Sequence, residues 1–229
     1  MARLTAAIFD IDGTLTDSVD IHALAWQEAL SHFKHDLPYE RVRSQIGKGG
    51  DQLLKALLSP EDLTKQGEEL DQYRGELFKR KYMRLINPLS MVPQLFQRIR
   101  QDDLRIVLAS SAKEDEVEFY TNLLGISEFL ETSTSSDDAE KSKPHPDIFA
   151  AAMDRLGNPS PGGVIVVGDT PYDAQAATAL ELTCVGMLSG GWKAEKLIEA
   201  GCTAVFRGPA DLLARYDKSP LASKLNKAA

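Results

Sequence analysis

The sequence is poor in cysteine, in positive charge and in long apolar runs, and each shortage excludes a class of protein. Only two of the 229 residues are cysteines, Cys184 and Cys202. Both lie in apolar stretches, so we interpret them as buried thiols rather than as a disulfide or a metal pair. The net charge of −8 argues against the basic surface that binds nucleic acid. No run of 18 apolar residues is present, so we expect no membrane span and no membrane partner.

Targeting signals and internal repeats are also missing. Arg3 is followed by only a short apolar run that ends at Asp10, so we expect no signal peptide and a cytoplasmic location. An apolar content of 43% is ordinary for a globular protein, and the length fits a core domain with a small insertion. We expect a monomer whose tail, residues 218–229, is a frayed end.

Short apolar runs alternate with helical patterns along most of the chain. The predicted strands cover residues 4–9, 104–109, 129–132, 164–167, 183–187 and 204–206. Such alternation is typical of a parallel sheet with right-handed crossover connections. We therefore predict an α/β fold with a Rossmann-like parallel sheet flanked by helices.

The alternation stops after the first predicted strand. Apolar residues follow a helical period there instead, for example from Leu53 to Leu58, and the segment is too long for a simple loop. We predict a helical domain of residues 18–87, inserted into a core domain formed by residues 1–17 and 88–229.

Two aspartates follow the first predicted strand, in the run from Asp10 through Asp12 and Gly13 to Thr14. Carboxylates side by side at a strand end repel each other and lose solvation, so without a partner their pKa values shift or the fold is destabilised. A divalent cation resolves this conflict, and Mg²⁺ prefers oxygen ligands of this kind. An ordinary strand followed by an Asx turn is the plain alternative.

Three further polar positions follow in the chain. Ser110 and Ser111 end the second predicted strand, either as ligands for a phosphate or as the N-cap of the next helix. Lys143 precedes two prolines, which fix the backbone, and Asp169 follows an apolar strand. Ligands of open α/β sheets bind outside the carboxyl ends of the strands, so these distant residues are expected to converge on one pocket.

These motifs in this order resemble the haloacid dehalogenase superfamily, specifically its Mg²⁺-dependent phosphatases with an inserted helical cap, from about Leu4 to about Leu212. The resemblance implies that Asp10 attacks phosphorus and that Asp12, protonated when substrate binds, exchanges the proton. It also implies that Asp10, Asp169 and the backbone carbonyl of Asp12 hold Mg²⁺.

The resemblance gives roles to the remaining motif residues as well. Ser110, Ser111 and Lys143 would bind the phosphate, with Lys141 as a competitor that lacks the following proline. Asp173 would bind the metal through water or orient its loop, unless it is a plain helix cap. Thr14 is typical of the phosphatases of the superfamily.

Three residues of the inserted cap are candidates for the substrate site. In related enzymes a histidine at the position of His22 approaches the second aspartate, although an interfacial histidine bonded to a carbonyl is the alternative. Lys48 and Gly49 open a helix, either against the leaving group or as a plain turn. We interpret the loop from Gly190 to Trp192 as a loop anchor, and the alternative is that it borders the pocket.

The expected activity is hydrolysis of a small phosphorylated metabolite, such as a sugar phosphate or phosphoglycolate. A dehalogenase or a phosphonate hydrolase has no use for the acid at Asp12. A sugar-phosphate mutase stays open, although the arginine those mutases carry in the cap loop corresponds to Gly50. A non-catalytic binding module is expected to have lost a charged motif residue, and all of them are present.

Overall fold

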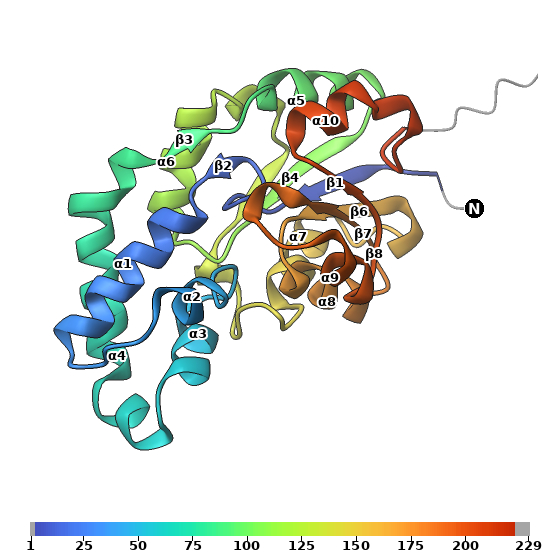
Figure 1. The fold of residues 1–229 in the computed structure, drawn as a ribbon. Helices are drawn as coiled ribbons and strands as arrows, with labels where there is room; N and C mark the ends of the chain where they lie inside the picture. The colour runs from blue at the N-terminus through green and yellow to red at the C-terminus, as the bar shows by residue number, and fades with distance from the viewer. Residues whose placement is uncertain (1–2, 223–229) are drawn as a thin grey trace, which may run out of the picture.

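One parallel sheet organises the computed structural model, which describes residues 3–222 (Figure 1). Its six strands pair in the order β5-β4-β1-β6-β7-β8. Their bounds are Ala6–Phe9 for β1, Arg105–Ala109 for β4, Thr132–Thr134 for β5, Val164–Gly168 for β6, Thr183–Met187 for β7 and Cys202–Phe206 for β8. Every pairing is parallel, which confirms the predicted α/β fold.

Helices cover both faces of the sheet (Figure 1). One face carries α5 (Val92–Gln101), α6 (Glu114–Leu124) and α10 (Pro209–Ala214), and the other carries α7 (Asp147–Arg155), α8 (Pro171–Ala179) and α9 (Ala194–Glu199). Successive side chains of β1 point to opposite faces of the sheet. Ala7 and Phe9 pack in the hydrophobic core on one face, and Ala6 and Ile8 pack in the core on the other face. Because all four are buried, this strand is apolar without interruption.

A set of helices inserted between β1 and β4 forms the cap, which we define as residues 19–85. It contains α1 (Val19–His32), α2 (Tyr39–Arg43), α3 (Gly50–Leu57) and α4 (Pro60–Leu77), then a π-helical turn at Phe78–Tyr82 and a 3-10 turn at Met83–Leu85. The two connections to the core pair as a short antiparallel ribbon of β2 (Thr16–Asp17) and β3 (Asn87–Pro88). This ribbon is too short to produce an alternating pattern in the sequence.

Some details differ from the sequence-based predictions. The strand predicted at residues 129–132 starts only at Thr132, because Ser127–Phe129 form a 3-10 turn. Within the predicted frayed tail Leu221 is buried, and residues 223–229 lie outside the described part of the chain. Cys184 and Cys202 are buried free thiols, as predicted, but they lie on paired strands with their sulfur atoms 3.6 Å apart.

Across residues 3–222, no helix has both the length and the hydropathy that a membrane crossing requires.

Candidate active site

Three neighbouring strands of the sheet end at one edge and place polar residues there. In the sheet β1 lies between β4 and β6. Asp10 follows β1, Ser110 follows β4 and Asp169 follows β6. Parallel strands present their carboxyl ends on the same side, so the topology brings these distant residues together.

Lys143 is a buried lysine held between two carboxylates. Its Nζ donates to Oδ1 of Asp10 at 2.5 Å and to Oδ1 of Asp173 at 2.8 Å, and the residue is only 1% exposed. Burial lowers the pKa of Lys143, but the two carboxylates outweigh it and raise the pKa above its ordinary value. The side chain is therefore a permanent cation, whereas its competitor Lys141 is exposed.

Both carboxylate oxygens of Asp173 are engaged. Oδ1 accepts from Lys143, and Oδ2 accepts from the backbone nitrogen of Thr170 at 3.0 Å and from its hydroxyl at 2.6 Å. The backbone nitrogen of Asp173 donates back to that hydroxyl at 3.2 Å, which completes a capping box at the start of α8. Asp173 thus caps a helix and also orients Lys143.

Asp169 is fully buried, and one of its oxygens has no partner. The hydroxyl of Thr14 lies 3.3 Å from Oδ1 of Asp169 and 3.2 Å from Oδ2 of Asp10, and it has one hydrogen to share between them. Among the described residues nothing bonds Oδ2 of Asp169. A Cβ at Gly13 or Gly190 would lie only 2.4 or 1.6 Å from that oxygen, so the loop that starts at Gly190 borders the site and needs glycine there.

The acidic cluster is suited to a divalent cation. One oxygen each from Asp10, Asp169 and Asp173 lies within 4.8 Å of the others. Burial and the neighbouring carboxylates raise the pKa of Asp10 to about 7, despite Lys143, and raise that of Asp169 well above its ordinary range. Three ionised carboxylates beside one ammonium leave a formal charge of −2. A divalent ion would neutralise this charge and use the unpartnered oxygen of Asp169 as a ligand.

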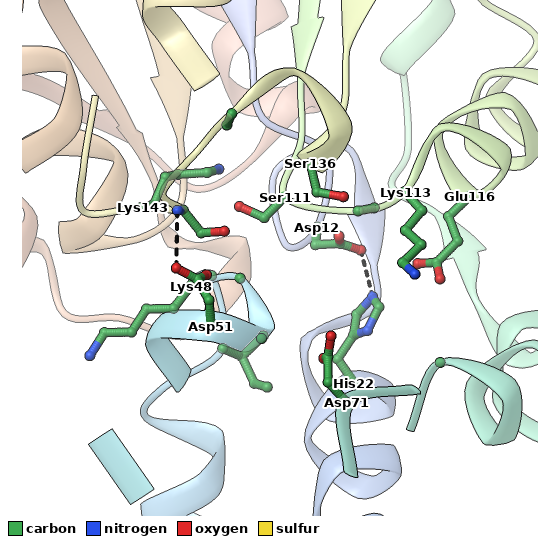
Figure 2. A pocket seen from close by; sticks show the side chains of 18 of the residues that line it. Asp12, His22, Lys48, Asp51, Asp71, Ser111, Lys113, Glu116, Ser136 and Lys143 are labelled. Atoms are coloured by element: carbon green, nitrogen blue, oxygen red, sulfur yellow. Dashed lines mark hydrogen bonds and ion pairs between the residues drawn. The ribbon is translucent and has the colours of Figure 1, made fainter. Parts of the chain in front are cut away.

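Asp12 faces the cap rather than this cluster. Its Oδ1 accepts from the hydroxyl of Ser18 at 2.6 Å and from Nε2 of His22 at 2.9 Å (Figure 2). Burial raises the pKa of Asp12, but His22 and Ser18 reverse the effect and bring it down to about 2. Asp12 is therefore ionised in the ligand-free protein, whereas the sequence analysis expects a protonated Asp12 when substrate is bound.

His22 connects Asp12 to the cap helices. Nη2 of Arg74 donates to Nδ1 of His22, the imidazole stacks on Phe78 with 4.4 Å between ring centroids, and the hydroxyl of Tyr120 lies 3.1 Å from Nε2. A guanidinium only donates, so Nδ1 must be the acceptor nitrogen. With Nδ1 as acceptor, the ring carries its hydrogen on Nε2, which points at Asp12.

The two serines after β4 have different surroundings. The Oγ of Ser110 accepts from the backbone nitrogen of Ala112 at 3.1 Å. The hydroxyl of Ser111 lines the cavity and is buried with no partner among residues 3–222. Helix α6 begins at Glu114 with Lys113 as its N-cap, so the alternative that the serines cap this helix is wrong. Of these two serines, Ser111 is therefore the one with a free hydroxyl facing the cavity.

A cavity of about 260 Å³ lies between the core and the cap (Figure 2). Asp10 and Asp12 lie on its core side, and Lys48 and Gly49 line it from the cap. A Cβ on Gly49 would lie 2.0 Å from the hydroxyl of Ser142, so the cap loop rests directly on the core. The Nζ of Lys48 donates a hydrogen bond to Oε1 of Gln45 and lies over the ring of Tyr172. Ligand pockets usually exceed about 300 Å³, so this one suits a small molecule.

Several residues that line this cavity could not be predicted from the sequence. They come from α4 and from the start of α6 with its N-cap, and they are Asp71, Arg74, Lys113 and Glu116. None belongs to a recognisable local pattern, because only the packing of the cap on the core brings them together.

Comparisons with known proteins identify one family. A family model described as haloacid dehalogenase-like hydrolase matches residues 7–187. Phosphoglycolate phosphatase from Yersinia pestis is 30% identical over 210 residues, which cover 90% of each chain. Pyrophosphatase PpaX from Bacillus velezensis is 26% identical over 76% of this chain and 78% of that protein. The crystal structure of a hydrolase from Pseudomonas syringae has a TM-score of 0.85 and 32% identity, with 93% of this chain and 98% of that one covered. The chain therefore belongs to the haloacid dehalogenase-like hydrolase family.

Proposed function

We propose that this protein is a Mg²⁺-dependent phosphatase that hydrolyses a small phosphomonoester through an aspartyl phosphate on Asp10. The observation that carries the proposal is the position of Asp10. Its carboxylate faces the cavity with Lys143 on one oxygen and Thr14 beside the other, and Asp12 lines the same cavity. The relatives named as phosphoglycolate phosphatase and pyrophosphatase support the same class of reaction.

The metal ligands in this proposal are the side chains of Asp10 and Asp169 and the backbone carbonyl of Asp12. The unpartnered Oδ2 of Asp169 supports this choice. Asp173 is left out because Lys143 and Thr170 already occupy its oxygens. When bound, Mg²⁺ would neutralise charge on the phosphoryl oxygens.

The bonds that form and break in this reaction involve only the substrate, this chain's own residues and water. An oxygen of Asp10 attacks phosphorus, the bond from phosphorus to the ester oxygen breaks, and Asp12 gives a proton to the departing oxygen. Asp12 then takes a proton from a water molecule, whose oxygen attacks the phosphorus of the aspartyl phosphate. Inorganic phosphate leaves, and Asp10 is regenerated.

Because the pKa of Asp12 is low in the ligand-free protein, Asp12 must first gain the proton that it donates to the departing oxygen. A phosphomonoester has a second pKa near 6, so about a tenth of it is the monoanion at pH 7, and this form carries a proton. Its negative charge beside Asp12 also raises the pKa of that carboxyl, which is the direction needed for proton transfer. We infer that substrate binding supplies the proton, and His22 holds Asp12 in position to receive it.

The remaining phosphoryl oxygens are assigned to Lys143 and to the serines after β4. Lys143 is a buried cation, and Ser111 offers a free buried hydroxyl. Fixed donors of this kind, buried away from water, provide the electrostatic stabilisation on which phosphoryl transfer depends. The cap, predicted from the sequence at residues 18–87, would exclude bulk water and admit only a small substrate.

The test is phosphate release from a panel of small phosphomonoesters, in Mg²⁺ and in EDTA, by the wild type and by Asp10→Asn. A matched control is Asp154→Asn, which changes an exposed aspartate of α7. We expect metal-dependent release that Asp10→Asn abolishes and that the control retains. Release by Asp10→Asn at the wild-type rate would refute the proposal, and conversion of a sugar 1-phosphate in place of hydrolysis would favour the mutase.

A further inference from the structure

The part of the cavity formed by α4 and α6 carries charges that the protein leaves largely unpaired. Asp71 and Arg74 come from α4, Glu116 comes from α6, and Lys113 is the N-cap residue just before α6. In Figure 2 the side chains of Asp71, Lys113 and Glu116 point toward the space between the core and the cap. The cluster lies in the same cavity as Asp12, on the side where the group leaving the phosphate would be.

Glu116 is the most unusual member of the cluster. It is only 3% exposed, and within residues 3–222 no side chain or backbone group forms a hydrogen bond with its carboxylate. Burial raises its pKa, and burial raises the pKa of Asp71 as well, again with no hydrogen bond to the carboxylate from the described chain. Glu116 is buried and Asp71 is partly buried. A carboxylate that loses water without gaining a donor is destabilised, so these two carboxylates are suited to a ligand that donates.

The neighbouring cations do not satisfy these carboxylates. Arg74 uses Nη2 on His22, and its Nε is buried with no partner in the described chain. The cluster therefore offers acceptors on Asp71 and Glu116 and an unused donor on Arg74. A hydroxyl group both donates and accepts, whereas an ammonium only donates and a carboxylate only accepts.

The charged residues that line the cavity also favour an uncharged leaving group. Apart from Asp10, Asp12 and Lys143, the cavity is lined by more acidic than basic side chains. The acidic ones are Asp51, Asp71, Glu116 and Glu140, and the basic ones are Lys48, Arg74 and Lys113. A leaving group that carries a carboxylate would meet like charge at Asp71 and Glu116, which is unfavourable in a buried site. A neutral leaving group does not have this penalty.

We propose that the leaving group is a neutral polyhydroxylated molecule, a polyol or a sugar, whose hydroxyls donate to Glu116 and Asp71. The same two acids select against esters such as phosphoglycolate, in which the leaving group is a carboxylate. This inference rests on the proposed phosphatase function and specifies its substrate class.

The experiment compares kcat/KM for three esters in Mg²⁺: sorbitol 6-phosphate, phosphoglycolate and methyl phosphate. Wild-type protein should prefer the polyol ester over phosphoglycolate by at least about 10-fold, the value of one well-placed hydrogen bond to a charged group. Glu116→Gln should lower kcat/KM for the polyol ester by about 10-fold, raise it for phosphoglycolate and leave methyl phosphate unchanged. The matched control is Glu118→Gln, which changes an exposed glutamate of the same helix.

Two results would overturn the inference while phosphatase activity stands. One is a wild-type preference for phosphoglycolate, and the other is an equal loss on all three esters in Glu116→Gln, which indicates a purely structural role. Absence of phosphate release from every ester by the wild type would instead overturn the proposed function, and this inference with it.

Discussion

Arg74 donates a hydrogen bond to Nδ1 of His22 and so determines which nitrogen of that ring carries the proton. Nε2 then faces Asp12 at 2.9 Å with its hydrogen. Arg74 and His22 belong to the cap, and Asp12 belongs to the core. The hydrogen bond from His22 to the carboxylate proposed to exchange the proton therefore forms only when the cap is seated on the core.

We expect Arg74→Ala to lower kcat by about 10- to 100-fold, because His22 loses its fixed tautomer and no longer orients Asp12. Nitrogen NMR of His22 should change from a single tautomer with the proton on Nε2 to a mixture. Arg41→Ala serves as the control, since Arg41 is an exposed arginine of cap helix α2. An unchanged tautomer together with an unchanged kcat would show that Arg74 has no such role.

Asp169→Asn should make the metal-free protein more stable and at the same time remove its response to Mg²⁺. The substitution replaces a buried carboxylate that lacks a partner on Oδ2 by a neutral amide. Removing such an unpartnered buried charge should raise the free energy of unfolding by about 1–3 kcal/mol. Each kcal/mol shifts the Tm by roughly 2–4 °C at this chain length. Thermal melts in EDTA and in Mg²⁺ test this, with Glu69→Gln on the exposed face of α4 as the control. A Mg²⁺-induced rise in Tm that survives in Asp169→Asn would exclude Asp169 as a ligand.

Lys143→Ala should weaken phosphate binding and turnover together and should also destabilise the fold. Removing the ammonium leaves Asp10 and Asp173 as adjacent buried carboxylates, a type of change that costs about 3–5 kcal/mol. Calorimetry with inorganic phosphate and urea denaturation measure the two effects. Lys141→Ala is the control, and a larger loss of phosphate affinity in the control would transfer the role to Lys141.

Without metal, stability should fall as the pH rises from about 4 toward 7. In that window folded Asp10, with a pKa raised to about 7, keeps a proton that the unfolded chain releases. Asp12 acts in the opposite direction, since its pKa of about 2 contributes stability above about pH 4 that is lost as the pH falls toward 2.

Urea denaturation in EDTA at about pH 5 and about pH 7.5 measures the first effect. Mg²⁺ should reduce the difference, because the ion takes the place of the proton among the carboxylates. Greater stability at the higher pH in EDTA would contradict the raised pKa of Asp10.

The sheet could be predicted from the sequence because its central strands are buried on both faces. Strands such as β1 and β6 are therefore continuous apolar runs, and the residues just after them, Asp10 and Asp169, mark the edge of the sheet where we propose that the substrate binds. The short ribbon of β2 and β3 could not be predicted, since two-residue strands have no periodicity.

The cap side of the site could not be predicted for a different reason. Arg74 and Glu116 lie on ordinary amphipathic helices, where a charged residue usually faces solvent. They line the cavity only because α4 and α6 pack around it. The difference between Ser110 and Ser111 likewise depends on a local turn, in which Ser110 bonds the backbone of Ala112.

Trapping the phosphoryl group on Asp10 is the most direct measurement of the proposed mechanism. Wild-type protein turning over a good ester in Mg²⁺ would be quenched in acid within milliseconds, digested and analysed by mass spectrometry. We predict a phosphorylated peptide whose modified residue is Asp10, absent in EDTA and absent from Asp10→Asn. Rapid turnover with no phosphorylated aspartate, or with the phosphoryl group on another residue, would contradict the account.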